Sequence, residues 1–89
     1  MIKAPLTLIN KLGLHARAAA KLSTMASEYH SEIKVEKAGR CADCKSIMAV
    51  MMLAASKGTE LIFEVEGEDE EAAFTAIKTL IEDRFGEPE

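Results

Sequence analysis

The sequence predicts a single α+β domain with the element order β-α-β-β-α-β-α. Polar and apolar residues alternate at residues 32–37 and 60–66, which is typical of strands with one buried face. Elsewhere apolar residues recur every three or four positions, which is typical of helices with one buried stripe. With 89 residues the chain can build one core but not a deep cavity, so residues 1–89 should form one domain with its chemistry near the surface.

The first third of the chain predicts a strand, a loop and a helix. Residues 2–9 alternate in part, and Pro5, which lacks an N–H, indicates a strand at the edge of the sheet. Residues 10–13 break the pattern as a loop. A helix follows directly after His15. Its apolar stripe consists of Ala19, Leu22, Ala26 and Tyr29.

The middle of the chain predicts a hairpin and a second helix. Residues 32–37 and 40–43 form two strands joined by a tight turn. Residues 47–56 are an apolar helical stretch, with Ser46 as its N-cap and Gly58 beyond its end. The stretch is apolar on nearly every side, so we expect part of it to contact a partner.

The last third predicts a strand over residues 60–66 and a third helix. The acid-rich run at residues 68–71 favours a helix N-terminus through the helix macrodipole. Gly86 and Pro88 stop this helix. Its apolar stripe consists of Phe74, Ile77 and Ile81, with Ala73 and Leu80 beside them.

Charge is distributed unevenly along the chain. Eleven basic and fifteen acidic residues give a net charge of −4, which argues against a nucleic-acid binder. Residues 60–89 carry eleven acidic and two basic side chains, a net −9, whereas residues 1–59 carry a net +5. Because the acidic portion is remote in sequence from the candidate site described below, we expect a basic docking face for acidic partner surfaces.

No targeting or membrane segment is visible in the sequence. The longest apolar run, residues 47–55, is far short of the ~20 residues needed to span a bilayer. The N-terminus alternates instead of running apolar, unlike a signal peptide. Cys41 and Cys44 without a secretory signal indicate a reducing compartment. We therefore expect a cytoplasmic protein that does not insert into a membrane.

The most informative segment for function is residues 13–17. A glycine loop ends at His15, and the free N–H groups of the following helical turn favour an anion. Arg17 adds a planar guanidinium suited to phosphate oxygens. These groups could accept a phosphoryl group on an imidazole nitrogen without a metal or another cofactor. His30 lacks this context, and we interpret it as an ordinary surface residue.

Two blocks of the sequence resemble one known family. Residues 10–17, Asn-Lys-Leu-Gly-Leu-His-Ala-Arg, are similar to the active-site segment of the HPr family, the histidine phosphocarriers of the bacterial phosphotransferase system. The leading Asn-Lys-Leu-Gly is most similar to the nitrogen-related branch, NPr. Residues 45–48 and 57–61 resemble the family's second signature. The spacing of the blocks and the element order match the family over essentially the whole chain.

The resemblance implies a reaction and a fold. His15 would accept a phosphoryl group on Nδ1 from enzyme I, itself charged by phosphoenolpyruvate, and pass it to a IIA-type domain in sugar uptake or nitrogen-related regulation. Arg17 and the backbone N–H groups of Ala16 and Arg17 would steady the phosphoryl group. The protein would be a monomeric carrier without a cofactor, not a stand-alone enzyme. The fold would be an open-faced β-sandwich, with a four-stranded antiparallel sheet ordered 1-4-2-3 and three helices on one face.

The resemblance also implies a regulatory site and a docking surface. Ser46 aligns with a serine that HPr kinase phosphorylates in some bacteria, although an N-cap alone also explains a serine here. By helical spacing Val50 and Leu53 are the better core candidates, which leaves the methionines near them adaptable at an interface. The family's exposed apolar docking surface aligns with Leu14, Ala20, Ile47, Met48 and Met51.

Two departures from the family keep alternatives open. The family usually has proline where this chain has Ala18, which gains an N–H near the anion site. It commonly has small or polar residues where this chain has Cys41 and Cys44, whose spacing also fits a redox pair or half of a zinc site. One alternative is therefore a small metal- or redox-binding module that uses both cysteines. Another is a regulatory homologue that binds partners in both phosphorylation states.

Overall fold

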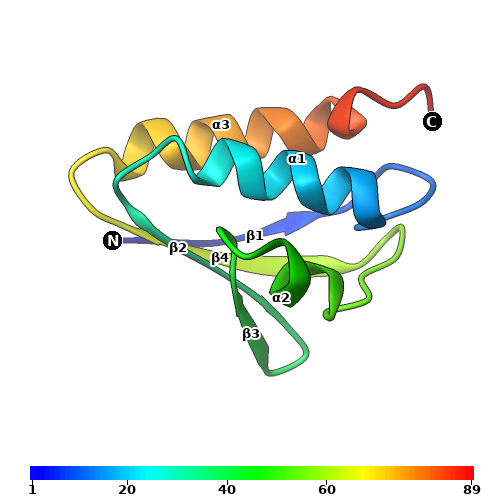
Figure 1. Cartoon of the computed structure of the whole chain (residues 1–89), viewed down its shortest axis with the longest axis horizontal. Coiled ribbons are helices and arrows are strands. Elements are labelled where there is room, and N and C mark those ends of the chain that lie inside the picture. The colour runs from blue at the N-terminus through cyan, green and yellow to red at the C-terminus, as the bar shows by residue number, and fades with distance from the viewer.

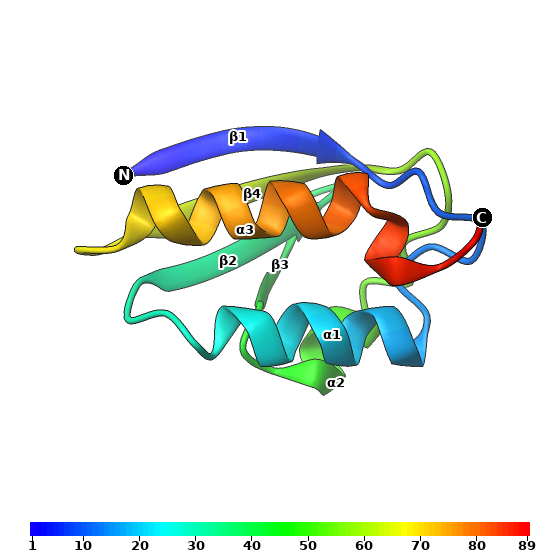
Figure 2. The ribbon, with the colours of Figure 1, turned by 90° about the horizontal axis from the view of Figure 1, so that it is seen from above.

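A computed structural model of residues 1–89 has one four-stranded antiparallel sheet with the strand order β1-β4-β2-β3, and its three helices pack on one face of that sheet (Figures 1 and 2). This confirms the predicted α+β architecture. None of the helices is long and apolar enough to cross a bilayer. The elements are β1 (Ile2–Thr7), α1 (Ala16–Ala26), β2 (Glu32–Lys37), β3 (Arg40–Asp43), α2 (Ile47–Met51), β4 (Glu60–Glu66), α3 (Glu70–Glu82) and a short turn η1 (Arg84–Gly86).

The strand β1 lies at one edge of the sheet, as Pro5 predicts. It pairs only with β4, and Pro5 lies opposite Ile62 in that antiparallel register. An edge strand tolerates proline because the missing N–H can face away from the ladder. The alternating residues of β4 place Leu61, Phe63 and Val65 on the buried face and leave the other face of the sheet open to solvent.

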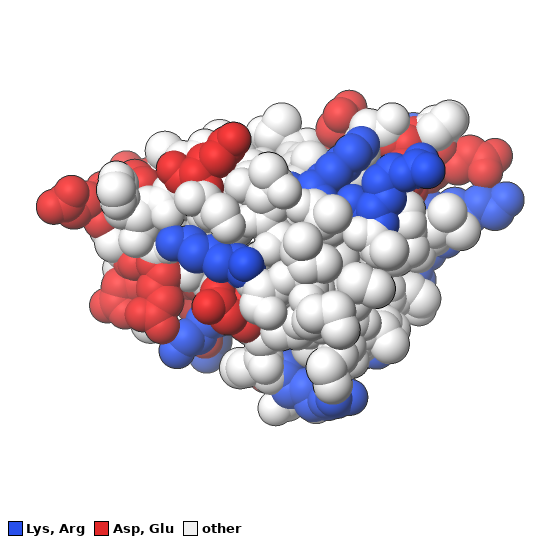
Figure 3. All heavy atoms as spheres, viewed as in Figure 1, with Lys and Arg blue, Asp and Glu red and all other residues white.

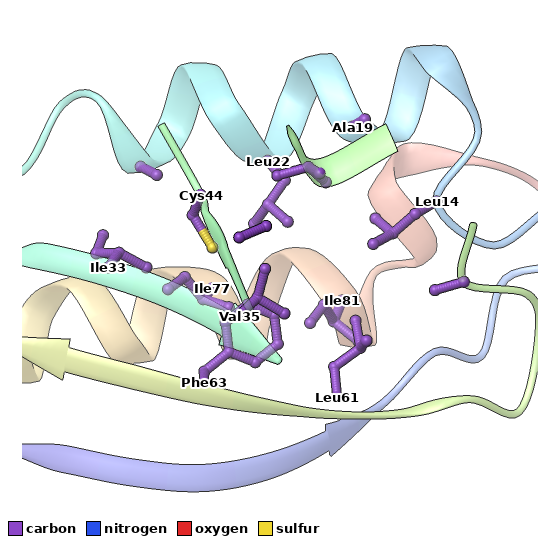
Figure 4. Close-up of a cluster of buried hydrophobic side chains, with 14 of the residues drawn as sticks. Leu14, Ala19, Leu22, Ile33, Val35, Cys44, Leu61, Phe63, Ile77 and Ile81 are labelled. Carbon is purple, nitrogen blue, oxygen red and sulfur yellow. The ribbon is translucent and has the colours of Figure 1, made fainter. Parts of the chain in front are cut away.

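A single core lies between the sheet and the helices (Figure 4). Leu22 of α1 and Ile77 of α3 pack there with Ile33, Val35 and Phe63 of the central strands, and all five are fully buried. Removing one such side chain from water stabilises the fold by about 1.5–3 kcal/mol. Twenty residues form this cluster, and only two of them are aromatic, so the core is mainly aliphatic.

The helix α2 is shorter than predicted. The apolar pattern predicts a helix over residues 47–56, but α2 ends at Met51. The N–H groups of Leu53 and Ala54 donate to carbonyls only three residues back, and Ala54 has a positive φ of 52°. Val50 reaches the core from α2, and Leu53 reaches it from the turn that follows α2. The apolar run therefore does not correspond to one continuous helix. Ser46 caps the helix as predicted, since its Oγ accepts the N–H of Ala49.

The loop before α1 is pinned to the segment that follows α2. The N–H of Leu14 donates to the carbonyl of Ala55 at 2.9 Å, and Leu8 exchanges backbone hydrogen bonds with Gly58 and Thr59. Gly13 has a φ of +62°, and a Cβ there would lie 2.3 Å from the Ala55 carbonyl oxygen. Glycine is therefore required at this position both by conformation and by space.

Asp69 ties the loop after α1 to the loop before α3. Its carboxylate accepts the N–H of His30 at 2.8 Å, the N–H of Ser31 at 2.9 Å and the hydroxyl of Ser31. The hydrogen bond from the Ser31 hydroxyl, followed by the one from the His30 N–H, lowers the pKa of Asp69 to about 2. This carboxylate therefore stabilises the folded state only while it is ionised.

Replacing Gly13 by alanine should destabilise the protein more than the same change at Gly39. Both glycines have positive φ, but a Cβ at Gly39 meets nothing within 4 Å. We expect Gly39→Ala to cost about 1–2 kcal/mol for the left-handed conformation and Gly13→Ala about 3 kcal/mol or more, because the Ala55 carbonyl must also move. Urea unfolding measures both, and equal losses would contradict the close approach at Gly13.

The contribution of Asp69 to stability should disappear at low pH. The carboxyl has a pKa of about 3.9 in an unfolded chain and about 2 in the fold, so its contribution is complete above pH 4 and is lost as the pH falls to 2. Urea unfolding of wild type and Asp69→Asn should thus differ at pH 6 and converge near pH 2. The neighbouring variant Glu68→Gln is the control. A wild-type advantage that persists at pH 2 would refute this origin.

Candidate functional site

His15 is the residue directly before α1. Its backbone is extended, with φ −71° and ψ 176°, and its carbonyl accepts the N–H of Ala19 at 2.8 Å, the first hydrogen bond of the helix. Its side chain makes no capping bond and is 26% exposed. The predicted helix start is confirmed, and the imidazole lies at the surface, where a second molecule can reach it.

The first turn of α1 offers unpaired N–H groups beside this imidazole. The N–H groups of Ala16, Arg17 and Ala18 donate to no acceptor in the protein. Arg17 is exposed and makes no ion pair. A shallow groove of the surface is lined by Lys11, Leu12, His15, Arg17, Glu87, Pro88 and Glu89. Helix N–H groups with a guanidinium nearby are suited to an anion such as a phosphoryl group.

The C-terminal residues bring a carboxylate to His15, which sequence reasoning missed. Oε2 of Glu87 contacts Nε2 of His15, and Oε1 of Glu87 accepts a hydrogen bond from Nδ2 of Asn10 at 3.1 Å. The Glu87 side chain is only 10% exposed. The hydrogen bond with His15 lowers the pKa of Glu87, with a smaller contribution from Asn10, although burial opposes this shift. Glu87 is therefore ionised near neutral pH.

A left-handed turn after α3 directs the chain to this position. Arg84, Phe85 and Gly86 all have positive φ, and Phe85 is 1% exposed in the core. The carbonyl of Phe85 accepts a hydrogen bond from Nζ of Lys21 at 2.6 Å. In both views the C-terminus lies beside the loop before α1 (Figures 1 and 2). The one sequence signal for this arrangement is Phe85, an apolar residue next to Gly86 just after the end of the helix.

The acidic portion of the chain, although remote in sequence, reaches the candidate site through Glu87 and Glu89, whereas the predicted basic docking face stays a prediction. Glu87 lies against His15, and Glu89 pairs with Lys11 at 3.3 Å between Oε2 and Nζ. In Figure 3 acidic and basic groups lie together at the end of the molecule that holds the C-terminus. Charge sums along the sequence cannot reveal this, because the last three residues fold away from the strand and helix that carry most of the acidic side chains.

An apolar surface over α2 lies near the site, with Lys and Arg along its edges (Figure 3). Ile47, Met48 and Met51 are exposed, as predicted, at 43%, 68% and 37%. Met52, which the sequence did not single out, is 63% exposed. Val50 and Leu53 are buried, as helical spacing predicts. We call Ile47, Met48, Met51 and Met52 the α2 patch.

Leu14 and Ala20, which were also expected on this surface, are less exposed than the α2 patch. Leu14 is 4% exposed and packs in the core (Figure 4), so the expectation that it is exposed is wrong. Its N–H bonds to Ala55, and this turns the Leu14 side chain inward while the next residue, His15, faces out. Ala20 is half-buried on α1 and offers a partner little area.

Cys41 and Cys44 do not lie on the same face of the protein. Cys41 is exposed on β3, whereas Cys44 is fully buried, and both are free thiols. Burial raises the pKa of Cys44 to about 12. Since the thiolate is the reactive and metal-binding form, Cys44 is poorly suited to either role. This geometry disfavours the alternative module built on the two cysteines.

Comparison with known proteins agrees with the fold and with the sequence blocks. Residues 2–83 match the family described as the PTS HPr component phosphorylation site. The phosphocarrier protein HPr of Cupriavidus necator is 51% identical over 89 residues and covers 100% of both chains. That of Pseudomonas aeruginosa is 54% identical over 85 residues and covers 94% of each chain.

Solved structures give the same result. The crystal structure of HPr-C-His from Thermoanaerobacter tengcongensis has a TM-score of 0.96 and 43% identity over 100% of both chains. A phosphocarrier protein HPr from Bacillus anthracis has a TM-score of 0.87 and 34% identity, over 90% of this chain and 95% of that one. With a family match over most of its length, relatives about half identical from end to end and a shared fold, the chain belongs to the HPr family, phosphocarriers of the phosphotransferase system.

Proposed function

We propose that His15 accepts a phosphoryl group on Nδ1 from enzyme I, charged by phosphoenolpyruvate, and passes it to a IIA-type domain. The observation that carries this proposal is the surface imidazole at the N-terminus of α1, next to unpaired helix N–H groups. An imidazole nitrogen is a nucleophile at neutral pH when its lone pair is free. No buried pocket surrounds it, which suits a residue that two different proteins must reach in turn.

The helix N-terminus and Arg17 stabilise the phosphoryl group in this proposal. The N–H groups of Ala16, Arg17 and Ala18 have no protein acceptor to lose when phosphoryl oxygens arrive. Ala18 adds an N–H where the family usually has proline. Arg17 is free of ion pairs, so its guanidinium can turn toward the same oxygens. Interactions of this kind are strongest where the charge builds up during transfer.

The α2 patch is the docking surface in this proposal. Its side chains are exposed and apolar, and methionine adapts to partners of different shape. We also propose that the carrier acts as a monomer. We place the reaction in the cytoplasm, where phosphoenolpyruvate is available.

Ser46 is a second proposed site of modification, by HPr kinase. Its hydroxyl caps α2 through the N–H of Ala49 at 3.3 Å and is half-buried. A phosphate there keeps an acceptor at the helix N-terminus but places about two negative charges beside the α2 patch. Such a modification would weaken docking while leaving His15 intact.

His15→Ala should abolish phosphorylation, whereas His30→Ala should leave it unchanged. Purified protein, enzyme I and radiolabelled phosphoenolpyruvate should give an acid-labile, base-stable phosphoprotein, the behaviour of phosphohistidine. Both histidines are accessible, so the pair is a matched control. Full labelling of His15→Ala would refute the site. Adding IIA-type proteins of the sugar and nitrogen branches one at a time should discharge the labelled carrier and identify its acceptor.

Met48→Glu should weaken docking to enzyme I. A charge in the apolar contact should raise the KM for the carrier about tenfold, which corresponds to ~1.4 kcal/mol, with a smaller change in kcat. Met48→Leu should behave as wild type, and Thr75→Glu places the same acid on the exposed face of α3 as a control. Equal KM values for Met48→Glu and Thr75→Glu would remove the α2 patch from the proposed interface.

A further inference from the structure

We propose that Glu87 is a positioning residue for phosphoryl transfer: its carboxylate keeps the imidazole proton on Nε2 of His15 and leaves the lone pair of Nδ1 free to attack phosphorus. The inference deepens the proposed function and rests on it. It concerns residues 87–89, which neither the motif at residues 13–17 nor the charge pattern predicts to lie at the site.

The protonation states on the two sides of the contact are linked. An ionised carboxylate can only accept hydrogen bonds, so Nε2 of His15 must be the donor to Oε2 of Glu87. In a neutral imidazole the proton is on one nitrogen only, and Nδ1 then carries the lone pair. Nδ1 makes no hydrogen bond within the protein. The contact therefore selects the tautomer in which the nucleophilic nitrogen is unoccupied.

Asn10 holds the Glu87 carboxylate, and Phe85 anchors the backbone that leads to it. The buried amide of Asn10 donates from Nδ2 to the carbonyl of Gly13 at 2.8 Å and to Oε1 of Glu87 at 3.1 Å. These two acceptors fix the orientation of the amide, because a flipped amide would place its oxygen against two oxygens. Phe85, two residues before Glu87, is anchored in the core and bound by Lys21. Glu87 thus approaches His15 as a pre-organised group.

The same contact serves both directions of the transfer. When Nδ1 attacks the phosphorus of phosphorylated enzyme I, the new bond is Nδ1–P, the bond that breaks is the donor's N–P bond, and its electron pair returns to the donor imidazole. No proton has to move, since Nε2 keeps its hydrogen. The phosphorylated ring then carries positive charge, which the Glu87 carboxylate balances. Transfer to the next acceptor reverses these changes and regenerates the neutral ring.

Glu87→Gln tests this role with little change in shape. A glutamine amide can accept from a protonated Nε2 or donate to an unprotonated one, so it selects neither tautomer. Nitrogen-15 chemical shifts of the His15 ring should show mainly the Nε2–H form in wild type and an increased Nδ1–H form in the variant. The single-turnover rate with saturating phosphorylated enzyme I should fall about tenfold, while KM changes less than about twofold.

Two further variants separate positioning from structural effects. Glu89→Gln removes the exposed partner of Lys11 in the same segment and should leave the ring shifts and the rate unchanged. Glu87→Ala removes the contact altogether and should lower the rate at least as much as Glu87→Gln. Thermal unfolding should show that all three variants keep the fold.

The outcomes separate this inference from the proposed function. If wild type is phosphorylated on His15 but Glu87→Gln keeps the wild-type tautomer and rate, only the role of Glu87 is refuted. A faster rate in Glu87→Gln also refutes it, because the carboxylate would then mask the imidazole instead of positioning it. If wild type is not phosphorylated on His15 at all, the proposed function fails, and the ring shifts still report whether Glu87 selects the tautomer.

Discussion

The backbone hydrogen bond from Leu14 to Ala55 determines where His15 lies. It joins the loop before α1 to the segment after α2, and the close approach at Gly13 allows the two backbones to meet. Leu14 turns into the core as a result, and His15 turns outward at the first turn of the helix. The residue that resemblance places on the docking surface is thus the anchor of the site, because one buried side chain fixes the direction of its neighbour.

The sequence was sufficient for β2, β3 and β4, for the start of α1 and for the cap of α2, because each of these depends on local patterns, whereas β1 ends at Thr7, two residues before the predicted end of that strand. Strand alternation, the proline at an edge and the serine before an apolar helix have short-range causes. The end of α2 could not be predicted from residues 47–56. Apolar residues there reach the core from a helix, a turn and an irregular segment in succession, and the hydrophobic pattern does not distinguish these conformations.

The contact of Glu87 with His15 could not be predicted from local sequence patterns, for a different reason. The two residues are 72 positions apart, and no periodicity connects them. Their meeting depends on three successive left-handed residues and on the burial of Phe85. Left-handed backbone at Arg84 and Phe85 is unusual for residues other than glycine, and the burial of the phenyl ring and the hydrogen bond from Lys21 help to offset its cost. A glycine next to an isolated aromatic residue after a helix is the pattern to look for in similar chains.

The small size of the chain explains why the site is open to solvent. A chain of 89 residues can place an imidazole, a few helix N–H groups and one guanidinium at its surface, but it cannot enclose them. Electrostatic stabilisation of a transferring phosphoryl group is strong only when water is excluded. In the proposed reaction the partner must supply that exclusion by docking on the α2 patch. The orientation and the tautomer of His15 must therefore be set before the partner docks. Leu14, Asn10 and Glu87 set them in the free carrier.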